Sequence, residues 1–377
     1  MTMAARSPHE KHRVSTPLEL LFDLVFVVAI ARAAAGFHHS LSEMHAAAGL
    51  VGYVMAFFAI WWAWMNFTWF ASAYDSDDVW YRIAVLIQIT GALILAAGIP
   101  ELFETRQINI ATVGGYVVMR LAMVGQWLRA AKCDPDHRAT AVRYAIGISV
   151  LQVFWAALLL VREWTAAGFV VFAVAELLVP VWAEGARQTT WHPHHIAERY
   201  GLFTIIVLGE SILSATVAIQ AVIESGEPLS PLVPTIIGGL LIVYSMWWIY
   251  FDRPAHDLLT SFRRGFAWGY GHYVVFAAVA AVGAGLAVVV DQLTRHSEIS
   301  PSAAGLAVTI PVVTFLLCLW VLHYRPVYRR TKWLAPMVAP FILLSSFTGQ
   351  AVLSTGLMLA GIVAIKVAVN KKFDESG

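Results

Sequence analysis

Long apolar blocks separated by short charged clusters are the dominant pattern along this chain. A helix needs about 20 apolar residues to cross a hydrocarbon core about 30 Å thick. The blocks are apolar all round, whereas barrel strands alternate apolar and polar residues. The pattern therefore predicts an all-α, polytopic transmembrane bundle of about twelve spans. We place the spans at residues 17–36, 46–70, 79–98, 108–129, 143–161, 165–183, 196–221, 231–251, 266–290, 302–323, 333–348 and 351–369.

Composition supports a membrane protein and excludes several other classes. Apolar residues make up 59% of the chain and charged residues 13%, with a mean hydropathy of +0.70. A soluble domain is about half apolar and about a quarter charged. The net charge of +1 does not favour a nucleic-acid partner. Cys133 and Cys318 are too far apart in sequence to indicate a disulfide framework or a metal site.

The N-terminal apolar block, which begins at Leu18, carries Glu19, Asp23 and Arg32 and has no clear small-residue cleavage site. We interpret it as a retained helix and not as a signal peptide. No glycine-rich phosphate loop and no nucleophile elbow is recognisable, so we expect neither a cofactor nor an enzymatic activity. The expected partners are the lipid bilayer and small ions or solutes, protons included.

The distribution of basic residues predicts the orientation of the chain. With a cytoplasmic N-terminus, most of the 25 Lys and Arg residues fall in inner segments. The predicted outer loops carry only Arg106, Arg162 and Arg295, while Arg32 and Arg120 lie within spans. Cytoplasmic loops of membrane proteins are enriched in Lys and Arg. We therefore expect both termini on the cytoplasmic side of the bacterial inner membrane.

Two regions of the chain share an order of features that indicates an internal repeat. The first and seventh spans each open with a glutamate, Glu19 or Glu198, and reach another ionisable residue about three turns deeper. The second and eighth spans each carry a Trp-Trp pair followed by an acidic inner loop. A 6+6 parallel repeat, an arrangement known in transporters, accounts for this order, and chance similarity between apolar helices is the alternative. The predicted division is a cytoplasmic segment 1–16, a first repeat 17–183, a linker 184–195, a second repeat 196–370 and a tail 371–377.

Ionisable side chains at membrane depth are the candidate functional residues, because a charge there is costly unless it meets a partner or a polar cavity. Glu19 and Asp23 are four residues apart and share one helix face, where they repel one another unless a cation lies between them. One interpretation is a set of structural ion pairs, such as Arg120 with Asp23 or Glu210. Another is a proton or ion relay at the interface between the repeats. The candidates are Glu19, Asp23, Arg32, Arg120, Glu176, Glu198, Arg199 and Glu210.

The segment Trp191-His-Pro-His-His-Ile-Ala-Glu198 suggests a metal site only weakly. His192, His194 or His195 could combine with Glu198 on one helical turn. The spacing matches no catalytic zinc signature. A hydrogen-bonded helix start at the membrane interface is the alternative, and we expect no bound metal.

Two long segments resemble those of the bacterial low temperature requirement A (LtrA) family. They are Glu19-Leu-Leu-Phe-Asp-Leu-Val-Phe-Val-Val-Ala-Ile and Glu198-Arg-Tyr-Gly-Leu-Phe-Thr-Ile-Ile-Val-Leu-Gly-Glu-Ser. The resemblance covers about residues 17–370 and implies an integral membrane protein linked to growth in the cold. By position it points to Glu19, Phe22, Asp23, Glu198, Arg199, Gly201, Gly209 and Glu210.

Three functions remain as hypotheses. The first is a secondary transporter or permease, proton-coupled through Asp23, Arg120 and Glu210. The second is a cation channel, which requires a homodimer or a larger assembly. The third is an intramembrane enzyme or lipid-handling protein that adjusts membranes in the cold.

Overall fold

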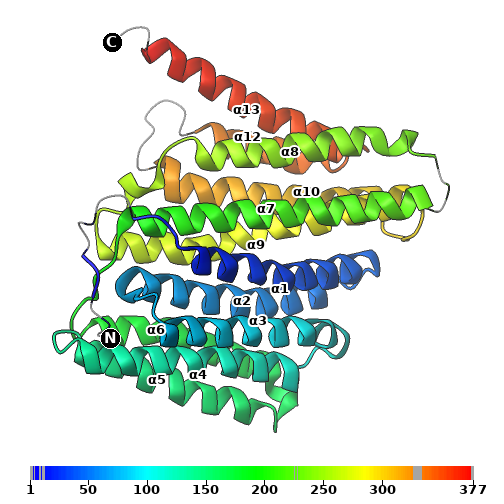
Figure 1. The fold of residues 1–377 in the computed structure, drawn as a ribbon. Helices are drawn as coiled ribbons and strands as arrows, with labels where there is room; N and C mark the ends of the chain where they lie inside the picture. The colour runs from blue at the N-terminus through cyan, green and yellow to red at the C-terminus, as the bar shows by residue number, and fades with distance from the viewer. Residues whose placement is uncertain are drawn as a thin grey trace. The chain divides into compact units, whose positions relative to one another are not determined.

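The computed structural model describes residues 3, 5–7, 10, 13–224, 226, 228–325 and 333–374, with side chains up to residue 369. Within these residues every regular element is helical (Figure 1). The charged residues Lys11, Glu227, Arg329, Arg330 and Lys332, and the side chains of the predicted tail 371–377, lie outside the described part of the chain. The α-helices are α1 (Pro17–Ser42), α2 (Ala46–Tyr74), α3 (Val79–Thr105), α4 (Ile110–Cys133), α5 (Arg138–Leu158), α6 (Thr165–Glu184), α7 (Pro193–Glu224), α8 (Val233–Phe251), α9 (Phe262–Leu293), α10 (Pro301–Leu319), α12 (Leu334–Ser345) and α13 (Ala351–Asp374).

The helices confirm the predicted fold class. Each predicted span coincides with an α-helix, and ten of the described helices are long and apolar enough to cross a membrane. The other two are α4, which carries Arg120 and Gln126, and α12, which has 12 residues. At 1.5 Å per residue α12 is about 18 Å long, less than the hydrocarbon core. The chain is therefore a multi-pass membrane protein, while its predicted orientation stays a prediction.

The break predicted at Gly349 separates the last two helices. α12 ends at Ser345 and α13 begins at Ala351. Gly349 has φ of +72°, a left-handed conformation that glycine adopts without the steric cost of a Cβ atom. This residue therefore allows the chain to turn where two apolar runs almost touch in sequence.

The chain forms two compact units. The first unit comprises Met1–Ala33 and Val51–Phe203, and the second comprises Ala34–Leu50 and Thr204–Gly377. Their boundaries fall within helices, and α1 and α7 each contribute residues to both units. The predicted linker 184–195 lies within the first unit, and the internal repeat stays a prediction.

Close helix packing builds the first unit. α3 and α4 lie side by side over much of their length (Figure 1). A Cβ atom added at Gly91 would lie 2.7 Å from the carbonyl oxygen of Gly115, so the two backbones approach as only small residues permit. Asn109 starts α4 with a capping box, accepting from the Thr112 amide at 2.9 Å. These contacts hold α4, and with it Tyr116 and Arg120, against its neighbours.

The second unit packs α9 against α10 and α8 against α13. A Cβ atom at Gly238 of α8 would lie 2.6 Å from the Cα atom of Leu353 in α13. The end of α1 belongs to this unit, where His38 Nε2 and Ser42 Oγ lie 2.7 and 2.8 Å from the Asp291 carboxylate. Most of α9 is buried, as its apolar, alanine-rich sequence requires.

Candidate functional site

Four buried ionisable side chains from α1 and α7 meet in the first unit. Arg199 donates from Nε to Asp23 Oδ2 at 2.9 Å and from Nη2 to Asp23 Oδ1 at 2.6 Å. Its Nη1 donates to Glu19 Oε1 at 2.7 Å, and His195 Nε2 lies 2.9 Å from the same oxygen. All four side chains are fully buried. We call Glu19, Asp23, His195 and Arg199 the α1–α7 charge cluster.

Helix geometry explains why these residues meet. Glu19 and Asp23 are one turn apart on α1, and His195 and Arg199 are one turn apart on α7, so each pair presents one face. The planar guanidinium of Arg199 carries several donors, which lets it bridge two carboxylates at once. The cation that two neighbouring acids require thus comes from another helix.

Glu19 also closes the start of α1. Its Oε2 accepts from the Thr16 amide at 2.8 Å, while the Glu19 amide donates to Thr16 Oγ1 at 3.3 Å. This reciprocal pair is a capping box, with Pro17 at the first helical position. The start of a helix favours negative charge because its backbone N–H groups are unpaired. Glu19 is therefore held by contacts at the start of its own helix as well as by Arg199 and His195.

Aromatic side chains surround Asp23. Trp64 of α2 donates from Nε1 to Asp23 Oδ1 at 2.6 Å. The Trp64 ring stacks on Phe203 with centroids 4.3 Å apart and meets Tyr200 edge-on at 4.8 Å. These rings keep the carboxylate in a low-dielectric environment, where its interactions with Trp64 and Arg199 are stronger than in water.

The charges of the α1–α7 charge cluster do not balance when His195 is neutral. Two carboxylates face one guanidinium, which leaves one negative charge. Among the described residues of the N-terminal segment and the α2 end, Arg6 and Arg13 interact with Glu10 and Asp75, two positive charges with two negative ones. His195 Nδ1 is buried without a hydrogen-bond partner among the described residues. A proton on His195 would make the cluster neutral.

A second buried carboxylate, Glu176 of α6, lies in the same unit. It accepts hydrogen bonds from Arg120 Nη2 at 2.8 Å, Trp62 Nε1 at 2.9 Å and Tyr116 Oη at 3.0 Å. Gln152 Nε2 donates to it at 3.3 Å. We call Glu176, Arg120, Tyr116, Gln152 and Trp62 the Glu176 cluster. It joins α2, α4, α5 and α6 through one carboxylate.

Two tryptophans of α2 donate hydrogen bonds, one to each cluster. Trp61 and Trp62 are buried in the middle of α2, which continues to Tyr74. Trp62 and Trp64 are two residues apart and therefore about 200° apart around the helix. One reaches Glu176 and the other reaches Asp23. Buried indoles usually find a partner for their N–H group, and here a carboxylate provides it.

The other predicted site residues lie elsewhere. Arg32 is exposed, and the half-buried Glu198 accepts from the Ser15 amide at 3.3 Å. Glu210 belongs to the second unit, where Ser214 donates to it at 3.0 Å. The predicted pairing of Arg120 with Asp23 is wrong, because each side chain forms an ion pair with a different residue. Arg120 pairs with Glu176, and Asp23 with Arg199.

The histidine segment forms hydrogen bonds. His192 Nε2 lies 2.8 Å from the carbonyl oxygen of Glu10, and His194 is exposed. Among the residues that the structure describes, no three His, Cys, Asp or Glu side chains are grouped as metal ligands. The sequence suggested His195 only as a candidate metal ligand. In the structure His195 is part of the α1–α7 charge cluster.

Some residues of these clusters were not predicted. Thr16 had a signal, since Thr-Pro-Leu-Glu is a helix-start pattern with Glu three residues after Thr. Trp64, Tyr116 and Gln152 had none, because an aromatic residue or glutamine in an apolar span is compatible with packing alone.

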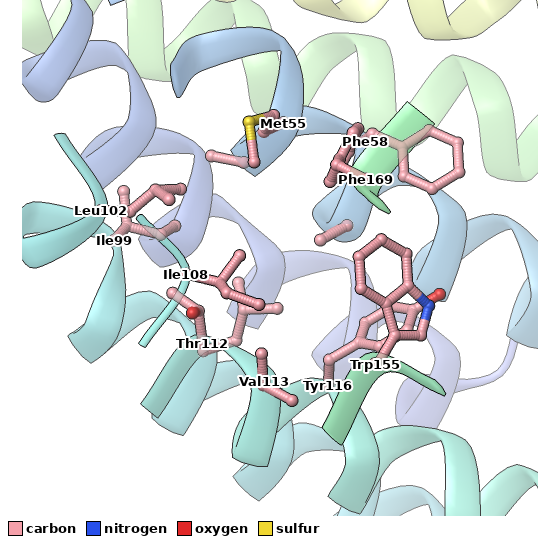
Figure 2. A pocket seen from close by; sticks show the side chains of 13 residues that line it. Met55, Phe58, Ile99, Leu102, Ile108, Thr112, Val113, Tyr116, Trp155 and Phe169 are labelled. Carbon is pink, nitrogen blue, oxygen red and sulfur yellow. The ribbon is translucent and has the colours of Figure 1, made fainter. Parts of the chain in front are cut away.

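An apolar cavity of about 50 Å³ lies beside the Glu176 cluster (Figure 2). Residues of α2 to α6 line it, among them Met55, Leu102 and Phe169. Tyr116 and Trp155 form part of its wall, with their ring centroids 6.1 Å apart. Tyr116 thus belongs to both the cavity wall and the Glu176 cluster.

Buried carboxylate–guanidinium clusters inside a bundle of long apolar helices define a polytopic helical membrane protein with intramembrane charge sites. The model of the family described as bacterial low temperature requirement A protein (LtrA) matches residues 14–370, and the chain belongs to that family. An uncharacterized protein of Rhizobium meliloti (strain 1021) is 27% identical over 285 residues, which cover 69% of this chain and 67% of that protein. No solved structure matches the chain.

Proposed function

We propose that the chain is a proton-coupled secondary transporter of the bacterial inner membrane, with the α1–α7 charge cluster as its proton-binding site. The observation that carries the proposal is the uneven charge of this fully buried cluster. Burying a net charge in a low-dielectric interior costs several kcal/mol. Binding a proton removes the net charge, so proton binding and the conformation of this site are energetically linked.

His195 is the residue that we assign to the proton. It contacts Glu19 through Nε2 and keeps Nδ1 unpaired, so a second proton on the ring needs no existing hydrogen bond to break. Asp23, which receives three hydrogen bonds from Arg199 and Trp64, is better satisfied as a carboxylate.

The predicted internal repeat supports the transporter class. Many transporters are built from two related bundles with buried polar sites. The chain forms two compact units, and α1 and α7 each contribute residues to both. A purely structural role for the cluster remains the alternative that the experiment must separate.

The test is solute-driven proton flux into proteoliposomes that contain a pH-sensitive dye. Small carboxylates, amino acids and sugars are added one class at a time against an imposed pH gradient. We expect one class to accelerate acidification of the lumen by the wild-type chain, and His195→Gln and Asp23→Asn to abolish that acceleration. Arg82→Gln, which breaks the exposed ion pair with Asp77, is the matched control and should retain it.

Each other outcome counts against the proposal. Proton flux that is unchanged in both variants would leave the cluster with a structural role only. Ion current without any solute would favour a channel. No response to any solute class would remove the transporter assignment.

A further inference from the structure

Arg120 has unused hydrogen-bonding capacity in the Glu176 cluster. Its Nη2 donates to Glu176, but its Nε and Nη1 groups are buried without a partner among the described residues. A buried donor left without an acceptor costs about 1–3 kcal/mol, more for a charged group. A bound molecule that carries acceptor atoms would satisfy these groups.

Two neighbours of Arg120 share this property. Gln152 Oε1 and Trp155 Nε1 are also buried and unpaired, and both side chains are more than nine-tenths buried. Gln152 donates to the same carboxylate as Arg120, and Trp155 packs edge-on against Tyr116. Three of these four unused groups, Arg120 Nε and Nη1 and Trp155 Nε1, are donors, which indicates an acceptor-rich ligand.

The charge of the site limits what that ligand can be. Arg120 and Glu176 form a neutral buried pair, so a bound anion would add a buried negative charge unless a proton accompanies it. Guanidinium groups bind carboxylates particularly well because their planar donors match two oxygens. We propose that a small monocarboxylate replaces Glu176 as the counter-ion of Arg120 while Glu176 takes up one proton from the aqueous phase.

The exchange conserves charge. Before it, Arg120 pairs with the Glu176 carboxylate; after it, Arg120 pairs with the bound carboxylate and Glu176 is a neutral acid. The unpaired Gln152 Oε1 offers an acceptor for the new O–H group. Tyr116 and Trp62, the other neighbours of Glu176, can still donate to its oxygens. Arg120 and Tyr116 are the charged and titratable groups that contact Glu176 directly.

The apolar cavity beside the cluster suggests the rest of the ligand. Its wall includes Tyr116, which contacts Glu176, and Trp155, which carries one of the unused donors, and otherwise consists almost entirely of apolar side chains (Figure 2). A carboxylate at Arg120 could therefore extend an apolar body, such as a ring or a short branched chain, toward this space. The proposal that this weak acid is transported rests on the proposed function, whereas the proposal that it binds at this site does not.

Benzoate is the probe, titrated calorimetrically into the purified full-length chain in two buffers of different ionisation enthalpy. We expect uptake of about one proton per benzoate and a Kd that rises about tenfold per pH unit wherever binding takes up that full proton. Benzamide has the same ring without the charge, and we expect its binding to be at least about tenfold weaker.

Two variants make the test specific. Glu176→Gln mimics the protonated acid and should bind benzoate with no proton uptake and no pH dependence. The double variant R120Q/E176Q keeps the site neutral and should not bind benzoate. Arg82→Gln is the control and should bind like the wild type.

The inference fails if neither the wild type nor Glu176→Gln binds benzoate, if benzamide binds equally well, or if Glu176→Gln still takes up a proton. His195→Gln separates this inference from the proposed function, because it removes the proposed proton-binding residue and leaves the residues of the Glu176 cluster unchanged. Benzoate binding that persists while solute-driven flux is absent even in the wild type would uphold this site and overturn the transporter.

Discussion

Among the described residues, Arg199 is the cation that contacts both acids of α1. Removing one partner of a buried ion pair leaves uncompensated charge, which typically costs about 3–5 kcal/mol. We therefore expect Arg199→Gln to lower the free energy of unfolding by about this amount. Thermal unfolding of the detergent-solubilised chain measures the change. Arg82→Gln, at an exposed ion pair, should leave the midpoint nearly unchanged, and an equal effect of both substitutions would contradict the role of Arg199.

Asp75, which directly follows α2, gives the stability of the chain a specific pH dependence. Burial raises its pKa from 3.8 to about 6, Glu19 and Asp77 add to the rise, and Arg6 and Arg13 oppose it. The folded chain therefore holds this proton more tightly than the unfolded chain does between about pH 4 and 6. Stability contributed by protonated Asp75 is present below this window and is lost as pH rises through it.

Asp75→Asn tests this directly. Between pH 4 and 7 the wild type should lose about 1–3 kcal/mol of unfolding free energy relative to the variant. Unfolding of both chains is followed across that range. The control Asp77→Asn should keep most of the wild-type slope there, because the hydrogen bond from Arg82 lowers the pKa of Asp77 and Asp77 makes the smallest of the named contributions to the raised pKa of Asp75. Parallel pH profiles for the wild type and Asp75→Asn would contradict the assignment.

Single residues were only partly predictable from sequence. The shared face of Glu19 and Asp23, and their need for a cation, follow from a spacing of four. That the cation is Arg199 depends on which helices pack together, and sequence does not determine this. The importance of Arg120 and Glu176 was predicted from the cost of intramembrane charge, but their pairing was not.

At the scale of helices, the close contact of α3 with α4 requires glycine at position 115. A Cβ atom at Gly115 would lie 2.5 Å from the carbonyl oxygen of Gly91, whereas one at Gly114 would have no atom within 4 Å. Gly115→Ala should therefore destabilise the chain by about 1–3 kcal/mol through overpacking. Gly114→Ala is the matched control and should be neutral or stabilising, because alanine favours helix. Equal unfolding midpoints for the two variants would show that α3 and α4 do not pack this closely.

The positions of the helices were predictable because apolar blocks of about 20 residues have few alternatives in a membrane. The lengths of the helices were less predictable. α2 extends beyond its predicted end at residue 70 to Tyr74, and α12 stops after 12 residues. Polar and aromatic residues within α2 resembled the end of a span, yet Trp62 and Trp64 are satisfied by carboxylates inside the bundle.

For the whole molecule, the proposed proton coupling depends on one uncompensated charge in the first unit. The α1–α7 charge cluster is sealed from water, is held by hydrogen bonds and needs one proton to become neutral. A structural cluster could remain permanently in one charge state, whereas a coupling site must change its state during transport.

The most direct test is solute-driven acidification of proteoliposomes by the wild-type chain and by His195→Gln at equal protein density. We expect acidification by the wild type and an acidification rate at least about tenfold lower for His195→Gln. Equal rates for the two chains would contradict the assignment of His195 as the proton-binding residue.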